Sequence, residues 1–265
     1  MRGRYDLTQD ESCSGVKMMT LLQIDSSARL GRSGHDPHGS HSRRLTSHFL
    51  QHWLAKAPDT RVLRRDLAAQ PPRPVDNRWI EAAFTPEERR TPPMRDVLRE
   101  SDLLVDELVR ADVIVVGAPM YNFGVPAQLK AWIDNVVRVG RTFGFDRRRA
   151  GAPYWPMLAP GKRLVVLSAR GDGGYGPGGP LSESNLVESS LRVPMAYIGI
   201  TEVWSVAVEW DEFADSRVAA SLQRAEGDIE ALVARLAPAA LEPSAGRPKL
   251  LSAPDMLADP VQAPC

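Results

Sequence analysis

Short apolar runs alternate with amphipathic segments through most of this chain. The clearest are TLLQID at 20–25, DVIVVG at 112–117 and RLVVLS at 163–168, and a loop with polar or glycine residues follows each one. Strands that alternate with helices in this way predict a parallel sheet with crossover helices. The run at 112–117 has no polar alternation, which is typical of a strand covered on both faces. We therefore predict an α/β fold, a doubly wound five-stranded parallel sheet with helices on both faces.

The predicted elements fill the middle of the chain. The strands are expected at 20–25, 60–65, 112–117, 163–168 and 201–208. A helix is expected to begin near 42, and others to span about 77–84, 86–90, 101–111, 126–139, 182–197 and 215–236. Neither end of the chain has a sustained hydrophobic period. We expect a disordered extension at 1–17, one folded domain at 18–236 and a Pro/Ala-rich tail at 237–265.

The composition argues against several classes of protein. The 265 residues include 33 basic and 33 acidic side chains, and without a basic block we expect no nucleic-acid partner. Cys13 and Cys265 are the only cysteines, too few for a disulfide framework or a cysteine-based metal site. No apolar run approaches the roughly 20 residues that span a bilayer. The N-terminus lacks the apolar region of a signal peptide, so we expect a cytoplasmic protein with no membrane partner.

The loops after the first, third and fourth predicted strands contain the unusual residues. In a doubly wound sheet, ligands bind outside the carboxyl ends of the strands, where the strand order reverses. The three loops should therefore meet at one edge of the sheet. Each loop has a simpler explanation when taken alone, but their convergence predicts one binding site.

The loop after the first strand supplies hydroxyl groups near the start of a helix. Ser27 follows the strand, and Ser40, His41 and Ser42 precede or begin the helix. Hydroxyl and backbone N–H donors at a helix N-terminus bind phosphate well, and the helix dipole favours the negative charge. The simpler explanation is that Ser40 or Ser42 only caps the helix.

The other two loops suit a flat ring. APMYNFGVP at 118–126 combines aromatic residues with a turn, and Tyr121 and Phe123 there can contact a flavin while the turn supplies backbone polar groups. Otherwise these two rings only cover the core. SARGDGGYG at 168–176 allows close backbone approach, and Arg170 can offset the charge of a reduced flavin; otherwise it is a flexible linker.

Several motifs occur in a fixed order along the chain. They are A-P-M-Y-N-F at 118–123, R-V-G-R-T-F at 138–143, Ala169-Arg170-Gly171 and Y-I-G-I-T-E-V at 197–203. In these motifs the chain resembles the FMN-dependent NADH-azoreductase family, within the flavodoxin-like NAD(P)H:quinone oxidoreductases, over about residues 19–236. The resemblance implies a flavodoxin-like fold, FMN as cofactor and NADH or NADPH as co-substrate. It also implies a homodimer with its active sites at the subunit interface.

Carried over by position, the resemblance assigns a role to each of these loops. The expected cofactor-binding residues are Ser27, Ser40, His41 and Ser42 for the phosphate, and Met120, Tyr121, Asn122, Phe123, Ala169, Arg170, Gly171 and Gly173 for the ring. The expected substrate pocket contains Phe143 and Tyr197, and the long segment 146–158 adds Tyr154 and Trp155. This chain departs from the family in its longer 28–42 loop, in Ala169 where serine is usual and in the added Asp172.

The implied reaction needs no catalytic side chain, because FMN carries the chemistry. NAD(P)H would pass a hydride to flavin N5, and an azo or quinone-type acceptor, a small aromatic or conjugated molecule, would then take its place in a ping-pong scheme. Tyr121 and Phe143 would hold the reacting ring flat. Two alternatives stay open: a biosynthetic FMN-dependent isomerase or double-bond reductase acting on a conjugated substrate, and a non-enzymatic flavin-binding interaction protein.

All five histidines lie between 35 and 52, and His48 and His52 are one helical turn apart. Neither a carboxylate triad nor an H-E-x-x-H pattern accompanies them. We therefore predict ordinary surface histidines and no metal.

Overall fold

A computed structural model describes residues 18–238, so the segment 1–17 and all but the first two residues of the predicted tail lie outside the described residues. Five parallel strands form the central sheet, in the order β2-β1-β3-β6-β7. They are β1 (Thr20–Asp25), β2 (Arg61–Asp66), β3 (Val113–Pro119), β6 (Arg163–Ala169) and β7 (Glu202–Val208). The predicted doubly wound sheet is thereby confirmed, with the order reversing between β1 and β3.

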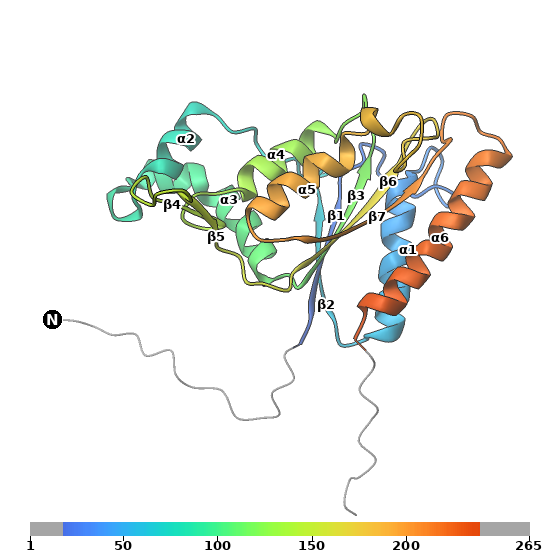
Figure 1. Cartoon of the computed structure of the whole chain (residues 1–265), viewed down its shortest axis with the longest axis horizontal. Helices are drawn as coiled ribbons and strands as arrows, with labels where there is room; N and C mark the ends of the chain where they lie inside the picture. Colours follow the sequence, from blue (N-terminus) through green and yellow to red (C-terminus); the bar gives the residue numbers. More distant parts are fainter. Residues whose placement is uncertain (1–17, 239–265) are drawn as a thin grey trace, which may run out of the picture.

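Helices cover both faces of this sheet (Figure 1). The helices are α1 (His41–Lys56), α2 (Asn77–Phe84), α3 (Pro92–Arg110), α4 (Ala127–Val136), α5 (Val187–Tyr197) and α6 (Ser216–Leu236). α1 and α6 share one buried cluster with the sheet, and α3, α4 and α5 share the other. β3 is buried along its whole length, as its uninterrupted apolar sequence predicts.

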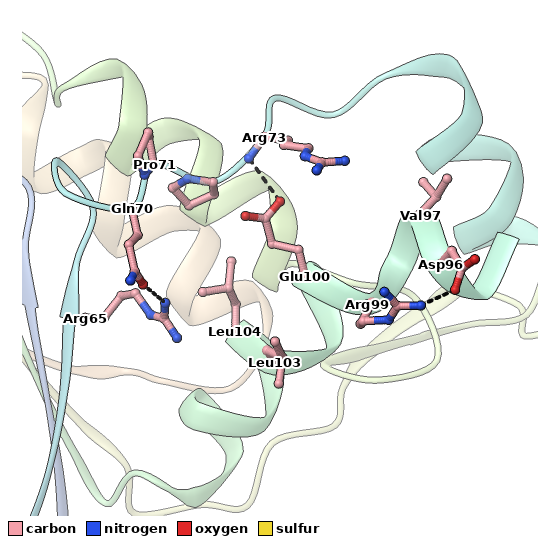
Figure 2. Close-up of a pocket in the computed structure, with 11 residues that line it drawn as sticks. Arg65, Gln70, Pro71, Arg73, Asp96, Val97, Arg99, Glu100, Leu103 and Leu104 are labelled. Atoms are coloured by element: carbon pink, nitrogen blue, oxygen red, sulfur yellow. Dashed lines mark hydrogen bonds and ion pairs between the residues drawn. The ribbon is translucent and has the colours of Figure 1, made fainter. Parts of the chain in front are cut away.

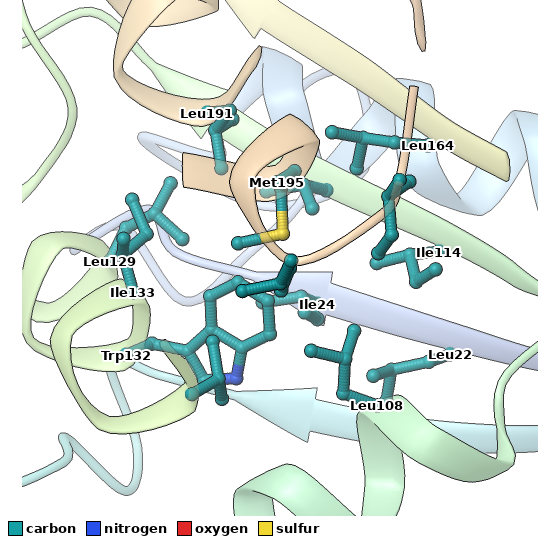
Figure 3. Packing of buried hydrophobic residues seen from close by; sticks show 14 of the residues in the cluster. Leu22, Ile24, Leu108, Ile114, Leu129, Trp132, Ile133, Leu164, Leu191 and Met195 are labelled. Atoms are coloured by element: carbon teal, nitrogen blue, oxygen red, sulfur yellow. The ribbon is translucent and has the colours of Figure 1, made fainter. Parts of the chain in front are cut away.

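Trp132 of α4 lies near the middle of the second cluster and is fully buried (Figure 3). Leu129 and Ile133 flank it on the same helix, while Leu108 and Met195 come from α3 and α5. This packing fixes α4 against the sheet. The loop that joins β3 to α4 is consequently anchored at both of its ends.

The helix before β3 begins earlier than its sequence suggests. α3 starts at Pro92 with Thr91 as N-cap, whereas a helix was expected only from 101. Proline at the first helical position has the required φ and no N–H to leave unpaired, so the Thr-Pro pair was the overlooked start signal. The expected helix at 86–90 is a 3-10 turn over Glu87–Arg89, and α5 begins at Val187 after a separate 3-10 turn, Ser182–Ser184.

An antiparallel hairpin was not expected. β4 (Phe143–Phe145) pairs with β5 (Tyr154–Pro156), and together they account for the long 146–158 segment. These strands are too short for a period-two pattern to stand out. Among residues 18–238, no helix has the length and apolar character needed to cross a bilayer.

Candidate functional site

A cavity of about 150 Å³ lies at the carboxyl edge of the sheet, where the strand order reverses. Four loops contribute to its walls, those that follow β1, β3, β6 and β7. The lining residues are Ser27, Arg29, Ser40, His41, Pro119, Met120, Tyr121, Ala169, Gly171, Asp211 and Glu212. The structure thus brings together the three loops singled out in the sequence.

The first wall is the N-terminus of α1. Ser40 is the N-cap, and its buried Oγ accepts a hydrogen bond from the Arg43 N–H at 3.4 Å. The Ser42 hydroxyl is also buried and lies 3.0 Å from the Ser40 hydroxyl. The first N–H groups of a helix have no acceptor within the helix. Hydroxyl groups and the positive end of the helix dipole therefore meet at one point, as an anion site requires.

Arg43 holds this wall in place. Its guanidinium makes a two-pronged ion pair with Asp66, at 2.7 and 2.8 Å, and donates to the carbonyls of Ser27 and Arg29 at 3.0 and 2.7 Å. Partial burial raises the pKa of Asp66, but the hydrogen bonds from Arg43 and from the Ala69 backbone lower it, and the net shift is downward. Arg43 consequently ties the loop after β1 to α1 and to the end of β2.

Gly117 of β3 lets α1 approach the sheet closely. A Cβ at this position would lie 2.9 Å from Thr46 Cγ2 and 3.0 Å from Asp25 Oδ1. Asp25 accepts a hydrogen bond from the Thr46 hydroxyl at 2.7 Å. Burial raises the pKa of Asp25 above its ordinary value despite this bond. Any larger residue at 117 would push α1, and with it the anion site, away from β3.

The second wall is a tight turn after β3. Tyr121 and Gly124 exchange backbone hydrogen bonds of 2.9 and 3.1 Å across the two intervening residues. Both of these have positive φ, 47° at Asn122 and 70° at Phe123. Asparagine tolerates this conformation, but it is strained for a bulky residue such as phenylalanine. The turn leaves both aromatic rings exposed, and the Tyr121 hydroxyl accepts from the Ala28 N–H at 3.2 Å.

The third wall comes from the loop after β6, but Arg170 does not contribute to it. Ala169 and Gly171 line the cavity. The Arg170 side chain is almost fully buried and forms ion pairs with Glu188 and Glu209. Two carboxylates therefore already balance its charge in this structure. These contacts differ from the role expected from the sequence, which was to offset negative charge on a flavin.

Gly173 lies beside the cavity rather than in its lining. A Cβ there would lie 2.1 Å from the ring of Trp210, so the absence of a side chain allows the two loops to pack together. Asn122 and Phe123 are likewise absent from the lining, although the preceding Met120 and Tyr121 belong to it. Ser42 does not line the cavity either, because its buried hydroxyl contacts that of Ser40.

The loop after β7 is the fourth wall, and its residues were not among those expected from the sequence. The Asp211 and Glu212 N–H groups donate to the carbonyls of Arg170 and Gly171, both at 3.1 Å. The sequence nevertheless indicates that this loop lies at the site. E-W-D-E-F at 209–213 follows a strand directly, and the carboxyl ends of parallel strands share one edge of the sheet.

Asp211 joins this fourth wall to the first. Its carboxylate lies 3.1 Å from His41 Nε2 and 3.6 Å from an Arg29 nitrogen. His41 Nδ1 lies 2.9 Å from the Ser33 hydroxyl. The hydrogen bond with His41 lowers the pKa of Asp211, against a smaller opposing effect of burial. Arg29, the His41 imidazole and the Asp211 carboxylate thus lie together beside the anion site.

The expected substrate-pocket residues form a separate cluster. The rings of Phe143, Tyr154 and Tyr197 lie with centroids 5.1 to 6.3 Å apart. Trp155 lies on the same hairpin and stacks under Arg149. The hairpin and the end of α5 are far from the tips of β3 and β6 (Figure 1). Within one chain, these residues and the crevice are therefore two distinct places.

A larger cavity, of about 340 Å³, lies between α3 and the segment after β2 (Figure 2). Its charged side chains largely satisfy one another. Arg65 forms an ion pair with Glu107 and donates a hydrogen bond to Gln70 Oε1 at 3.2 Å, and Arg99 forms an ion pair with Asp96. It is open, and it lies away from the point where the strand order reverses. We therefore assign the functional site to the smaller crevice.

Comparisons with known proteins agree with this fold. Residues 19–233 match the model of a family described as having a flavodoxin-like fold. The chain is 45% identical over 223 residues to the FMN-dependent NADH:quinone oxidoreductase of Opitutus terrae, covering 84% of this chain and 100% of that protein. It is 39% identical over 219 residues to FMN-dependent NADH:quinone oxidoreductase 2 of Colwellia psychrerythraea, covering 83% and 100%.

A solved structure shows the same fold. The FMN-dependent NADH-azoreductase from Bacillus anthracis, crystallised in complex with FMN, superposes with a TM-score of 0.70 at 20% identity. The match covers 83% of this chain and 100% of that one.

Proposed function

This chain belongs to the flavodoxin-like family of FMN-dependent NADH:quinone oxidoreductases, and we propose that it reduces quinone or azo-type acceptors with NADH or NADPH through FMN bound in the crevice. One observation carries the proposal. The buried Ser40 hydroxyl at the N-terminus of α1 and Tyr121 of the turn after β3 line the same cavity, at the reversal of strand order.

The phosphate end of FMN fits the first wall. Ser27 and Ser40 offer hydroxyls, and the first turn of α1 offers backbone N–H groups. Arg29 adds positive charge at the same place and His41 adds a ring nitrogen, although both contact Asp211. A bound phosphate would compete with Asp211 for Arg29 and His41. No lysine is needed for such a site.

The ring of FMN fits the other walls. Met120 and Tyr121 present an apolar and aromatic surface, and the absence of a side chain at Gly171 leaves its backbone accessible. FMN, when bound, accepts a hydride from NAD(P)H and passes the reducing equivalents to the acceptor. The protein supplies position and the exclusion of water. Since one crevice serves both substrates, they would bind in turn.

The acceptor pocket is completed by a second copy of the chain in this proposal. The elements that carry Phe143, Tyr154 and Tyr197, namely β4, β5 and the end of α5, lie away from the crevice of their own subunit (Figure 1), yet Tyr154 and Tyr197 are exposed. Burial raises the pKa of Tyr197, with a smaller effect from Tyr154. A homodimer that places this cluster over its partner's flavin would account for both observations. We place the activity in the cytoplasm, where NADH is produced.

The names of the relatives favour the reductase over the isomerase and the binding protein. The deciding experiment is anaerobic addition of NADH, or NADPH, to the FMN-loaded protein, followed by a simple quinone. We expect the flavin absorbance to bleach and then to return when the quinone is added. Flavin that stays oxidised with both nucleotides would contradict the proposal. Sedimentation of the same sample should give about twice the chain mass of 29.1 kDa.

A further inference from the structure

Two histidines and a glutamate converge where α6 packs against α1. His48 and His52 lie one turn apart on α1, and Glu230 comes from α6. Their ligand atoms all lie within 4.8 Å of one another. The sequence could not show this group, because Glu230 is distant in the chain and only the packing of α6 on α1 brings it near.

The distances suit a shared metal ion. Glu230 Oε1 lies 3.3 Å from His48 Nε2 and 3.6 Å from His52 Nε2. Two ligands bound about 2.0–2.2 Å from one tetrahedral metal are about 3.4 Å apart. The two distances from Glu230 Oε1 are therefore close to the spacing that a single ion requires, and all three donor atoms lie within 4.8 Å of one another.

The alternative is an ordinary ion-pair arrangement without a metal. However, the buried His48 Nε2 forms no hydrogen bond among the described residues, even though the Glu230 oxygen is only 3.3 Å away. A hydrogen bond would satisfy this nitrogen if it were well aligned. Metal coordination would also satisfy it, through the lone pair of the neutral imidazole.

Solvent can supply a fourth ligand, because the His52 and Glu230 side chains are 35% and 52% exposed. A cavity of about 290 Å³, large enough for water, also adjoins His48. The two arginines that line this cavity already have partners, since Arg44 pairs with Glu226 at 2.8 Å and Arg32 donates to Ser47 at 2.8 Å. These contacts limit the repulsion that an added cation would meet.

We propose that His48, His52 and Glu230 bind a divalent transition metal, of which Zn²⁺ is the best match to two imidazoles and a carboxylate. The bound ion would link α1 to α6. This site is separate from the crevice, and the proposal does not depend on the proposed function.

The test uses tag-free full-length protein that carries Cys13→Ser and Cys265→Ser, so that neither thiol competes for the metal. After treatment with EDTA and desalting, the protein is titrated with Zn²⁺ by calorimetry, with and without FMN. We expect one Zn²⁺ per chain in both cases. At a free Zn²⁺ concentration about 100 times Kd, the unfolding temperature should rise by about 5–10 °C.

Three variants separate this site from non-specific binding. His52→Gln and Glu230→Gln alter side chains that are 35% and 52% exposed, so both should fold. Each substitution should weaken Zn²⁺ binding by at least about tenfold. Loss of a residue that only supports a ligand already lowers metal affinity by about that factor, and these residues are ligands themselves. His38→Gln, an exposed histidine outside the group, should bind as the parent does. Absence of saturable binding, or equal losses in the His38 and His52 variants, would overturn the proposal.

Discussion

Replacing Ser40 with aspartate is expected to weaken FMN binding by at least about 100-fold without unfolding the protein. Aspartate caps a helix as well as serine does, so α1 should keep its N-terminus. The new carboxylate, however, would stand where the phosphate is proposed to bind. Two like charges about 4 Å apart repel by about 4 kcal/mol at a protein surface, and each 1.4 kcal/mol corresponds to tenfold in affinity.

Flavin fluorescence titration measures this effect, with riboflavin as the second ligand. Riboflavin lacks the phosphate, so its affinity should change little in the Ser40→Asp variant. Ser47→Asp is the matched control, because it places the same charge on α1 but beside Arg32, which already contacts Ser47. If both variants bound FMN as tightly as the parent does, the phosphate would not lie at the N-terminus of α1.

Replacing Arg43 with alanine is expected to lower the free energy of unfolding by about 2 kcal/mol. Loss of one partner from a fully buried ion pair costs about 3–5 kcal/mol. Asp66 is partly exposed, so the loss expected here is smaller than that range. The carbonyls of Ser27 and Arg29 would also lose a donor. FMN binding should weaken as well, since the loop after β1 would no longer be fixed to α1.

Urea denaturation of the Arg43→Ala and Arg44→Ala variants provides the comparison. Arg44 is the next residue and also forms an ion pair, with Glu226, but it is more exposed than Arg43. Its loss should cost less than about 1 kcal/mol. Equal losses in the two variants would mean that the contacts of Arg43 with the loop contribute nothing.

The effect of Arg43 should also depend on pH. The folded-state pKa of Asp66 is lowered, so the ionised pair stabilises the protein above the unfolded pKa of about 3.9. This contribution is lost as the pH falls through the folded value. The difference between the parent and Arg43→Ala should therefore shrink below about pH 4. A difference that stays constant on acidification would argue against the ion pair as its cause.

The sequence predicted the sheet because its strands are apolar and buried, which leaves a pattern that needs no knowledge of contacts. β1 occupies the predicted residues, and the strand order places the three loops together as expected. Thr91 and Pro92 marked the start of α3, but the polar residues that follow hid it. The three-residue strands β4 and β5 were too short to recognise.

The composition of the site was only partly predictable. Ser27, Ser40, His41, Met120, Tyr121, Ala169 and Gly171 line one cavity, because strand ends and helix starts are local features. The contacts of Arg170 could not be predicted, because its partners Glu188 and Glu209 lie on other elements. The grouping of Glu230 with His48 and His52 likewise arises only from packing between helices.

The central claim is that the crevice at the carboxyl edge of the sheet binds FMN by its phosphate and its ring together. Its most direct test is titration of the flavin-free, full-length protein with FMN and with riboflavin, followed by absorbance and fluorescence. We predict saturation at one FMN per chain and an FMN affinity at least about tenfold above that of riboflavin, since a charge-assisted hydrogen bond contributes about 1.5–3 kcal/mol. A protein that binds no FMN, or that binds riboflavin equally tightly, would contradict the account.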